Sequence, residues 1–86
     1  MKKIIIYSSS ICPYCIAAKI LLKKEGLSFE EKIIDGNQGL KELMIKKTNG
    51  KTSVPQIFFN EKLIGGYDQL QHLHQNNKLM DIVNGK

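Results

Sequence analysis

The 86-residue sequence contains no tryptophan and no arginine, and it has only two cysteines, two prolines and two histidines. It also lacks any apolar run near the roughly 20 residues that a membrane-spanning helix needs. The apolar start at residues 4–6 gives way to Tyr7 and three serines, far short of the core of a signal peptide. We therefore expect a cytoplasmic protein with no membrane segment.

The basic residues are all lysine, and they are spread along the whole chain to give a formal net charge of +5. Nucleic-acid binding typically uses arginine, clustered charge and stacking aromatics, and only 7% of these residues are aromatic. We therefore expect no nucleic-acid partner. A dispersed basic surface favours solubility and small anionic substrates.

The two cysteines, Cys12 and Cys15, lie three residues apart. A disulfide-stapled secreted domain would need more cysteines bridging longer loops, and a bridge across so short a loop adds little stability. The alternative is half of a zinc site, which needs two further ligands. His72 and His74 are two positions apart and would face different sides of a helix, so we expect no bound metal and interpret the pair as a redox dithiol.

The apolar pattern predicts one domain spanning residues 1–86, with the element order β-α-β-α-β-β-α. Strands are expected at residues 3–7, 29–34, 56–59 and 62–64, and helices from Pro13 to a stop at Gly26, at residues 40–47, and from residue 67 onward. The first β-α-β unit should form a parallel pair and the last two strands a hairpin. This gives a mixed four-stranded sheet with helices on both faces, and the cysteines follow the carboxyl end of the first strand.

Helical spacing predicts which side chains of each helix are buried. The expected buried faces are Ile16, Ala17, Ile20 and Leu21 in the first helix, Leu40, Leu43 and Met44 in the second, and Leu70, Leu73 and Val83 in the third.

The chemistry of the dithiol follows from its position at a helix start. Free backbone N–H groups and the helix dipole favour a thiolate at Cys12, whereas Cys15 lies one turn inside and should be less exposed and less acidic. We therefore expect Cys12 to attack a disulfide and Cys15 to resolve the intermediate. Pro13 suits the first turn, and Tyr14 should shape the rim.

Two other segments have both a structural and a functional interpretation. Pro55, in residues 52–56, is either a plain strand-edge proline or the second residue of a cis Val54–Pro55 bond beside the cysteines, with the Val54 backbone free to pair with an extended substrate. Gly65 to Asp68 are either a flexible turn with a helix cap or a helix N-terminus open to a carboxylate. Spacing alone does not decide either case.

Taken together, these segments resemble the glutaredoxins, in particular the small dithiol bacterial type. The resemblance rests on Cys12-Pro13-Tyr14-Cys15, Thr52-Ser53-Val54-Pro55-Gln56-Ile57-Phe58 and Ile64-Gly65-Gly66-Tyr67-Asp68, and it extends over essentially the whole chain. It implies a thioredoxin fold and an enzyme that glutathione reduces and that reduces protein disulfides and glutathione mixed disulfides. It implies that Cys12 forms the mixed disulfide with glutathione, and that glutathione is a co-substrate with no permanently bound cofactor.

The resemblance also implies a set of binding residues and partners. The implied glutathione-binding residues are Tyr14, Ser53, Val54, Pro55, Gly66, Tyr67 and Asp68. In this interpretation Val54 pairs through its backbone with the cysteine of glutathione, and Pro55 is cis. Implied partners are disulfide-containing or glutathionylated proteins, with ribonucleotide reductase as one candidate, and the expected state is a monomer.

The chain departs from the family pattern at two positions, with Ser9 where relatives usually carry lysine and Gln69 where many carry aspartate. Two alternatives remain open. One is a redoxin reduced by a thioredoxin-type reductase, which the absence of lysine at Ser9 favours but the segments at residues 12–15 and 65–68 oppose. The other is a carrier that holds an iron–sulfur cluster between two subunits through Cys12 and glutathione, although such relatives usually have a single-cysteine site.

Overall fold

The computed structural model describes residues 3–79 and 82 and contains the seven elements in the expected order. The strands are β1 (Ile4–Ser8), β2 (Glu30–Ile33), β3 (Gln56–Phe59) and β4 (Lys62–Gly65), and the helices are α1 (Pro13–Lys24), α2 (Gln38–Lys47) and α3 (Tyr67–Gln75). Val83, expected in the third helix, lies outside the described residues.

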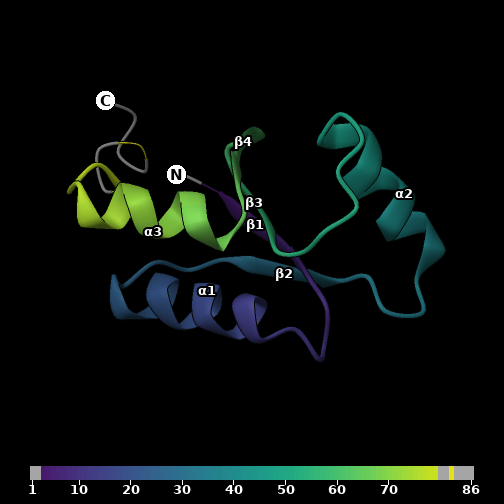
Figure 1. The fold of residues 1–86 in the computed structure, drawn as a ribbon, viewed down its shortest axis with the longest axis horizontal. Coiled ribbons are helices and arrows are strands. Elements are labelled where there is room, and N and C mark those ends of the chain that lie inside the picture. The colour runs from purple at the N-terminus through teal and green to yellow at the C-terminus, as the bar shows by residue number, and fades with distance from the viewer. Residues whose placement is uncertain (1–2, 80–81, 83–86) are drawn as a thin grey trace.

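The four strands form one mixed sheet in the order β2-β1-β3-β4 (Figure 1). β1 pairs with β2 in parallel, and β3 is antiparallel to both β1 and β4. The β3–β4 hairpin turns at Asn60 and Glu61, both with positive φ (52° and 70°), which is the backbone of the tight turns that suit the sheet twist. The fold class expected from the sequence is confirmed.

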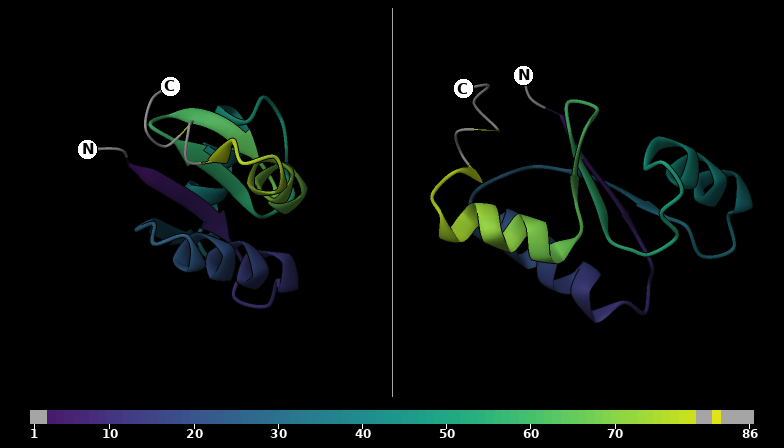
Figure 2. Two further views of the ribbon diagram at one scale, coloured as in Figure 1. Left: turned by 90° about the vertical axis from the view of Figure 1, so that its left-hand side faces the viewer. Right: turned by 45° about the horizontal axis from the view of Figure 1, so that its top comes forward.

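The helices cover both faces of the sheet, because successive side chains of a strand point to opposite sides. Ile4 and Ile6 of β1 pack in the cluster that contains Leu22 of α1 and Leu70 of α3. Tyr7 packs with Met44 of α2 and Phe58 in a separate cluster on the opposite face. Two further views show α1 and α3 together on one side of the strands and α2 on the other (Figure 2).

The buried faces of α1 and α2 differ from the expected ones. In α1 the buried residues are Cys15, Ala18 and Leu22, whereas Ile16 and Ile20 are 48% and 61% exposed. Residues 15–22 are almost all apolar, so spacing is compatible with more than one face, and the sheet selects the face that includes Cys15. In α2, Met44 is buried as expected, but Leu43 is exposed.

The topology brings three distant segments to one edge of the sheet. Tyr7, near the carboxyl end of β1, pairs with Gln56 at the start of β3, so Pro55 lies close to the loop that leads into α1. Ile57 pairs with Gly65 at the end of β4, directly before α3. The cysteine loop, the 52–56 segment and the start of α3 therefore meet at this edge.

Candidate active site

Cys12 and Cys15 occupy the start of α1. Cys12 is the N-cap of the helix, Pro13 is its first residue, and the Cys15 amide donates a hydrogen bond to Cys12 Sγ at 3.2 Å. Both cysteines are reduced; Cys12 is half-buried and Cys15 is fully buried. A backbone N–H at a helix N-terminus stabilises a negative charge on the sulfur that accepts from it.

The buried position of Cys15 makes its thiol hard to ionise. Burial, together with a hydrogen bond to Cys12, raises the pKa of Cys15 from 9.0 to about 12, although the nearby Lys19 opposes the rise. Cys15 is therefore a neutral thiol at physiological pH, and its full burial agrees with the expectation that it is the less exposed of the two.

Val54 lies directly against the reactive end of the dithiol. The Val54–Pro55 peptide bond is cis, which confirms that prediction, and Cys12 Sγ lies 3.7 Å from the Val54 carbonyl oxygen. Within the described residues the Val54 N–H has no hydrogen-bond partner. A free backbone group beside a reactive sulfur is available to an extended, peptide-like substrate.

Hydrogen bonds join the residues that precede Cys12 to β2 and to the residues that follow β2. Ser8 Oγ donates to Glu31 Oε2 at 2.6 Å, and Lys19 Nζ lies 2.7 Å from the same oxygen. The Ser10 amide and hydroxyl both donate to Asp35 Oδ2. Lys19 holds the pKa of Glu31 below its usual range, and the serine hydroxyls of the loop do the same for Asp35. Lys19 is thus already paired with a carboxylate.

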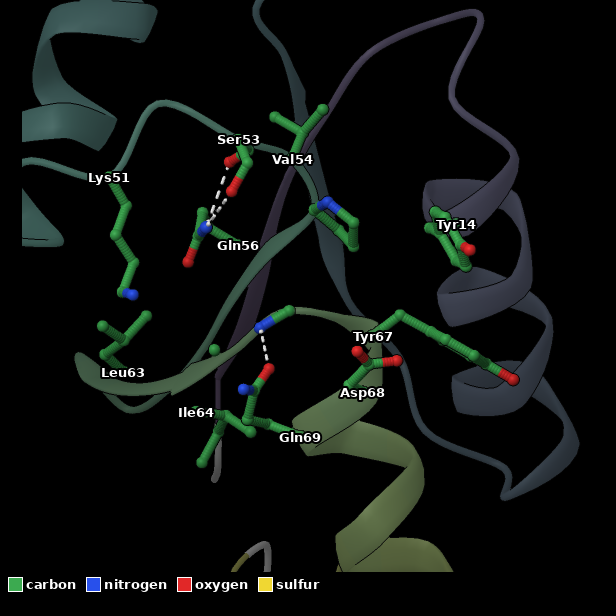
Figure 3. Close-up of a pocket in the computed structure, with 13 residues that line it drawn as sticks. Tyr14, Lys51, Ser53, Val54, Gln56, Leu63, Ile64, Tyr67, Asp68 and Gln69 are labelled. Carbon is green, nitrogen blue, oxygen red and sulfur yellow. Dashed lines mark hydrogen bonds between the residues drawn. The ribbon is translucent and has the colours of Figure 1, made fainter.

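A cavity of about 490 Å³ opens beside the dithiol, between the 51–56 segment, β4 and the start of α3 (Figure 3). Every glutathione-binding residue implied by the sequence lines it, namely Tyr14, Ser53, Val54, Pro55, Gly66, Tyr67 and Asp68. Cys12 adjoins it through its contact with Val54. The structure therefore gathers all the candidate residues, although they come from three separate segments.

The N-terminus of α3 forms one end of this cavity. Gly66 is its N-cap and donates its amide to Gln69 Oε1 at 2.9 Å, so Gln69 here has a capping role. The next amides, from Tyr67 onward, begin the helix, where three backbone N–H groups have no intrahelical acceptor. A side chain at Gly66 would press on the Pro55 carbonyl, with a Cβ at 3.3 Å, so this close approach favours glycine. Beside the helix start, the rings of Tyr14 and Tyr67 lie 6.1 Å apart.

Lys51 and Gln56 are two of the lining residues that were not predicted from the sequence to bind glutathione. Lys51 is the only basic residue that lines it among the described residues, and Figure 3 shows it on the side away from Tyr14. Gln56 is 3% exposed; its Nε2 donates to the Ser53 carbonyl at 3.0 Å, and its Oε1 has no partner within the described part of the chain. Lys51 does not stand out among so many lysines, but the polar side chain of Gln56 at the start of a buried strand was a usable signal.

Residues 3–79 and 82 also bear on a metal site and on a membrane span. This part contains no group of three His, Cys, Asp or Glu side chains placed to hold a metal ion. His74 contacts Glu25 at 2.9 Å, on the C-terminal side of α1, and His72 lies near Asn76. None of the helices in these residues is long and apolar enough to span a membrane.

Comparison with known proteins identifies the family. The sequence model of the glutaredoxin family matches residues 4–64. The chain is 49% identical over 73 residues to glutaredoxin 3 of Escherichia coli, covering 85% of this chain and 87% of that protein. It is 46% identical over 77 residues to a probable glutaredoxin of Synechocystis, covering 90% and 88%.

Solved structures agree with this assignment. A glutaredoxin from Brucella melitensis is 34% identical and superimposes with a TM-score of 0.81, covering 94% of this chain and 87% of that one. A buckwheat glutaredoxin–glutathione complex, at 23% identity, has the same fold with a TM-score of 0.86, covering 96% and 77%. The family match, the shared fold and the closely spaced Cys12 and Cys15 together show that the present chain belongs to the glutaredoxins and is a glutathione-dependent thiol–disulfide oxidoreductase.

Proposed function

We propose that Cys12 is the attacking thiolate, that Cys15 is the resolving thiol, and that the adjoining cavity binds glutathione. The observation that carries the proposal is the position of Cys12: its sulfur accepts the Cys15 amide and also touches the Val54 carbonyl at the rim of the cavity. A disulfide whose backbone pairs with Val54 would therefore present its sulfur directly to Cys12.

The simpler reaction removes glutathione from a mixed disulfide. The Cys12 thiolate attacks the glutathionyl sulfur, a Cys12–glutathione disulfide forms, and the substrate sulfur leaves as a thiolate that takes a proton from solvent. A second glutathione thiolate then attacks the glutathionyl sulfur, which releases oxidised glutathione and restores the Cys12 thiolate. This route requires only one cysteine of the protein.

Reduction of a protein disulfide uses both cysteines. Cys12 attacks one substrate sulfur to form a protein–protein mixed disulfide, and the second substrate sulfur leaves and is protonated. Cys15 then attacks Cys12 Sγ and forms the Cys12–Cys15 disulfide, while the departing substrate sulfur takes up the proton that Cys15 gives up, so the substrate is released as a dithiol. Two glutathione molecules reduce this disulfide and leave as oxidised glutathione. The high pKa of Cys15 keeps it protonated until this step.

The charges around the cavity match those of glutathione. Its γ-glutamyl end carries an ammonium and a carboxylate, which suit Asp68 and the free amides at the start of α3. The opposite end is the glycine carboxylate, for which Lys51 is the available cation. The middle of the tripeptide would pair with the Val54 backbone, flanked by Tyr14, Ser53, Pro55 and Tyr67.

The proposal also covers the cellular location, the oligomeric state and a candidate protein substrate. We place the protein in the cytoplasm, where the glutathione pool keeps thiols reduced. We propose that residues 1–86 form one domain that acts as a monomer, because both apolar clusters share a single sheet. Ribonucleotide reductase remains a candidate substrate, and its disulfide reduction can be assayed directly.

Replacement of each cysteine tests the two roles. Cys12→Ser should abolish both activities, because the attacking sulfur is gone. Cys15→Ser should retain removal of glutathione from a glutathionylated peptide while losing most of the reduction of a protein disulfide. Both activities are measured by coupling oxidised glutathione to its reductase. If Cys15→Ser were inactive in both assays and Cys12→Ser active in either, the two roles would have to be exchanged.

A further inference from the structure

A second cavity, of about 660 Å³, lies on the α2 side of the sheet and shares no residue with the glutathione cavity. Its lining combines apolar side chains of β1, β3 and α2 with lysines at its rim. Lys3 and Asn60 lie at the start of β1 and the end of β3, whereas Cys12 follows the opposite end of β1. The cavity is therefore separate from the dithiol in both face and position along the sheet.

The floor of this cavity is apolar. Ile5 and Phe58 are directly paired neighbours on β1 and β3, and the rings of Phe58 and Tyr7 meet edge to face at 5.8 Å. α2 packs on this face mainly through Met44, which is fully buried, and leaves Leu43 exposed at the wall of the cavity. An apolar group placed here would gain contact with side chains from both layers.

The hydroxyl of Tyr7 gives this floor a polar group. The Tyr7 side chain is 1% exposed, and its hydroxyl has no hydrogen-bond partner in residues 3–79 and 82. Within the same residues, Gln56 Oε1 is the only completely covered side-chain polar atom without a partner. The Tyr7 hydroxyl is therefore not completely covered by protein, and Tyr7 is one of the residues that line the cavity. Burial raises the pKa of Tyr7, so the hydroxyl stays protonated and can donate.

The rim of the cavity has a surplus of positive charge. Lys3 and Lys32 share Glu30, at 3.4 Å and 3.1 Å. Lys47 makes no ion pair within the described residues, and Glu61 is the one carboxylate among the lining residues. Three lysines against the two carboxylates Glu30 and Glu61 leave one positive charge uncompensated.

We propose that this cavity binds a small amphipathic monocarboxylate, such as a medium-chain fatty acid. The apolar chain would lie on Ile5, Phe58 and Leu43, and the carboxylate would accept from the Tyr7 hydroxyl and face Lys47 and Lys32. An apolar floor with one unpaired donor and one surplus cation selects a single negative charge over a neutral or highly charged ligand. The proposal does not rest on the thiol chemistry, since within the described residues the hydrogen bonds of Cys12 and Cys15 involve no residue of this cavity.

Titration of the reduced protein with octanoate, followed by amide chemical shifts in two-dimensional NMR, tests this site. Octanoate should produce saturable shifts centred on Ile5, Tyr7, Leu43, Lys47 and Phe58. Octanamide, with the same chain but no charge, should bind several-fold more weakly, and acetate should cause no saturable shift. Tyr7→Phe and Lys47→Gln should each weaken octanoate binding by about threefold or more, consistent with the loss of one hydrogen bond or one partly screened charge.

Lys24→Gln is the matched control, since Lys24 is an exposed lysine on α1, on the other face of the sheet, and should leave the affinity for octanoate unchanged. Lys47 is also exposed, so its replacement does not threaten folding. The proposal is overturned if shifts fail to saturate, centre on the glutathione cavity, are equal for octanoate and octanamide, or are unaffected by both cavity substitutions.

Discussion

Cys12 and Cys15 are the same amino acid one helical turn apart, and their surroundings make them chemically different. Cys12 caps α1, where backbone amides point toward its sulfur, while Cys15 faces the core with the apolar residues Ala18 and Leu22. This difference was predictable from the sequence, because a Cys-Pro-X-Cys segment after a strand fixes which sulfur is outermost. The partners of the preceding serines on β2 were not predictable, because they depend on the register between β1 and β2.

The cation that we propose in place of the family's lysine at position 9 could not be found from the sequence either. Ser9 lies beside Asp35, whose pKa its hydroxyl helps to lower, and Lys19 is paired with Glu31. Lys51 approaches the cavity from the chain segment before Pro55 instead. Only the folded path of residues 48–56 places it there, because nothing in local spacing relates position 51 to position 12.

Lys51→Gln tests that assignment. We expect the KM for a glutathionylated peptide to rise a few-fold with little change in kcat, because the lost charge binds the substrate and takes no part in sulfur exchange. The effect should shrink at high salt, since an exposed charge pair is screened and is worth only about 0.2–1 kcal/mol. Lys46→Gln, an exposed lysine on α2 outside both cavities, should leave KM unchanged. An equal effect of the two substitutions would show that only overall charge matters.

At the scale of the elements, the exposed side of α1 has apolar side chains that helical spacing predicted to be buried. Ile16 and Ile20 follow Cys12 at steps of four residues, so they continue from it along one side of the helix. Both are largely exposed, as are Ile11 and Tyr14 around the dithiol. Helical spacing alone predicted that Ile16 and Ile20 are buried, because an apolar stripe on a helix usually faces the core. The element order and hairpin were predicted correctly, since turns and strands there are marked by glycine, asparagine and β-branched residues.

We expect this apolar row to contact protein substrates but not small ones. The double substitution Ile16→Gln and Ile20→Gln should lower kcat/KM for a protein disulfide several-fold and leave activity on a glutathionylated tripeptide-sized substrate unchanged. Glutamine keeps the helix propensity of α1, so its stability should hold. Ile33→Gln, an exposed isoleucine on β2, serves as the control. A parallel loss on both substrates would instead mean that the substitutions disturb the dithiol.

At the scale of the whole molecule, the stability of the fold depends on pH in the alkaline range, because the Cys15 thiol and the Tyr7 hydroxyl are both buried. Burial raises the pKa of Cys15 from 9.0 to about 12 and also raises the pKa of Tyr7 above 10.0. The unfolded chain releases these protons at lower pH than the folded protein does. The free energy of unfolding is therefore fully retained below about pH 9 and falls as the pH rises toward 12.

Urea unfolding at a series of pH values checks this prediction. The wild-type protein should lose stability steadily from about pH 9 upward. Cys15→Ser should lose less stability than the wild type over the same range, whatever its stability at pH 7, because serine has no proton to release there. The lysines titrate in both proteins and cancel in the comparison. Identical slopes for the two proteins would rule out Cys15 as the source.

The wide separation of Cys12 and Val54, 42 positions apart in the sequence but in contact in the fold, has a consequence for synthesis. A ribosome releases the chain from its N-terminus, so both thiols emerge long before β3, β4 and α3 exist. A product truncated between residues 15 and 67 has both cysteines but lacks the helix start that we propose as the site of the γ-glutamyl group. On this proposal, substrate selectivity is acquired only after the chain up to α3 has been synthesised, and shorter products expose both thiols without the glutathione-binding groups.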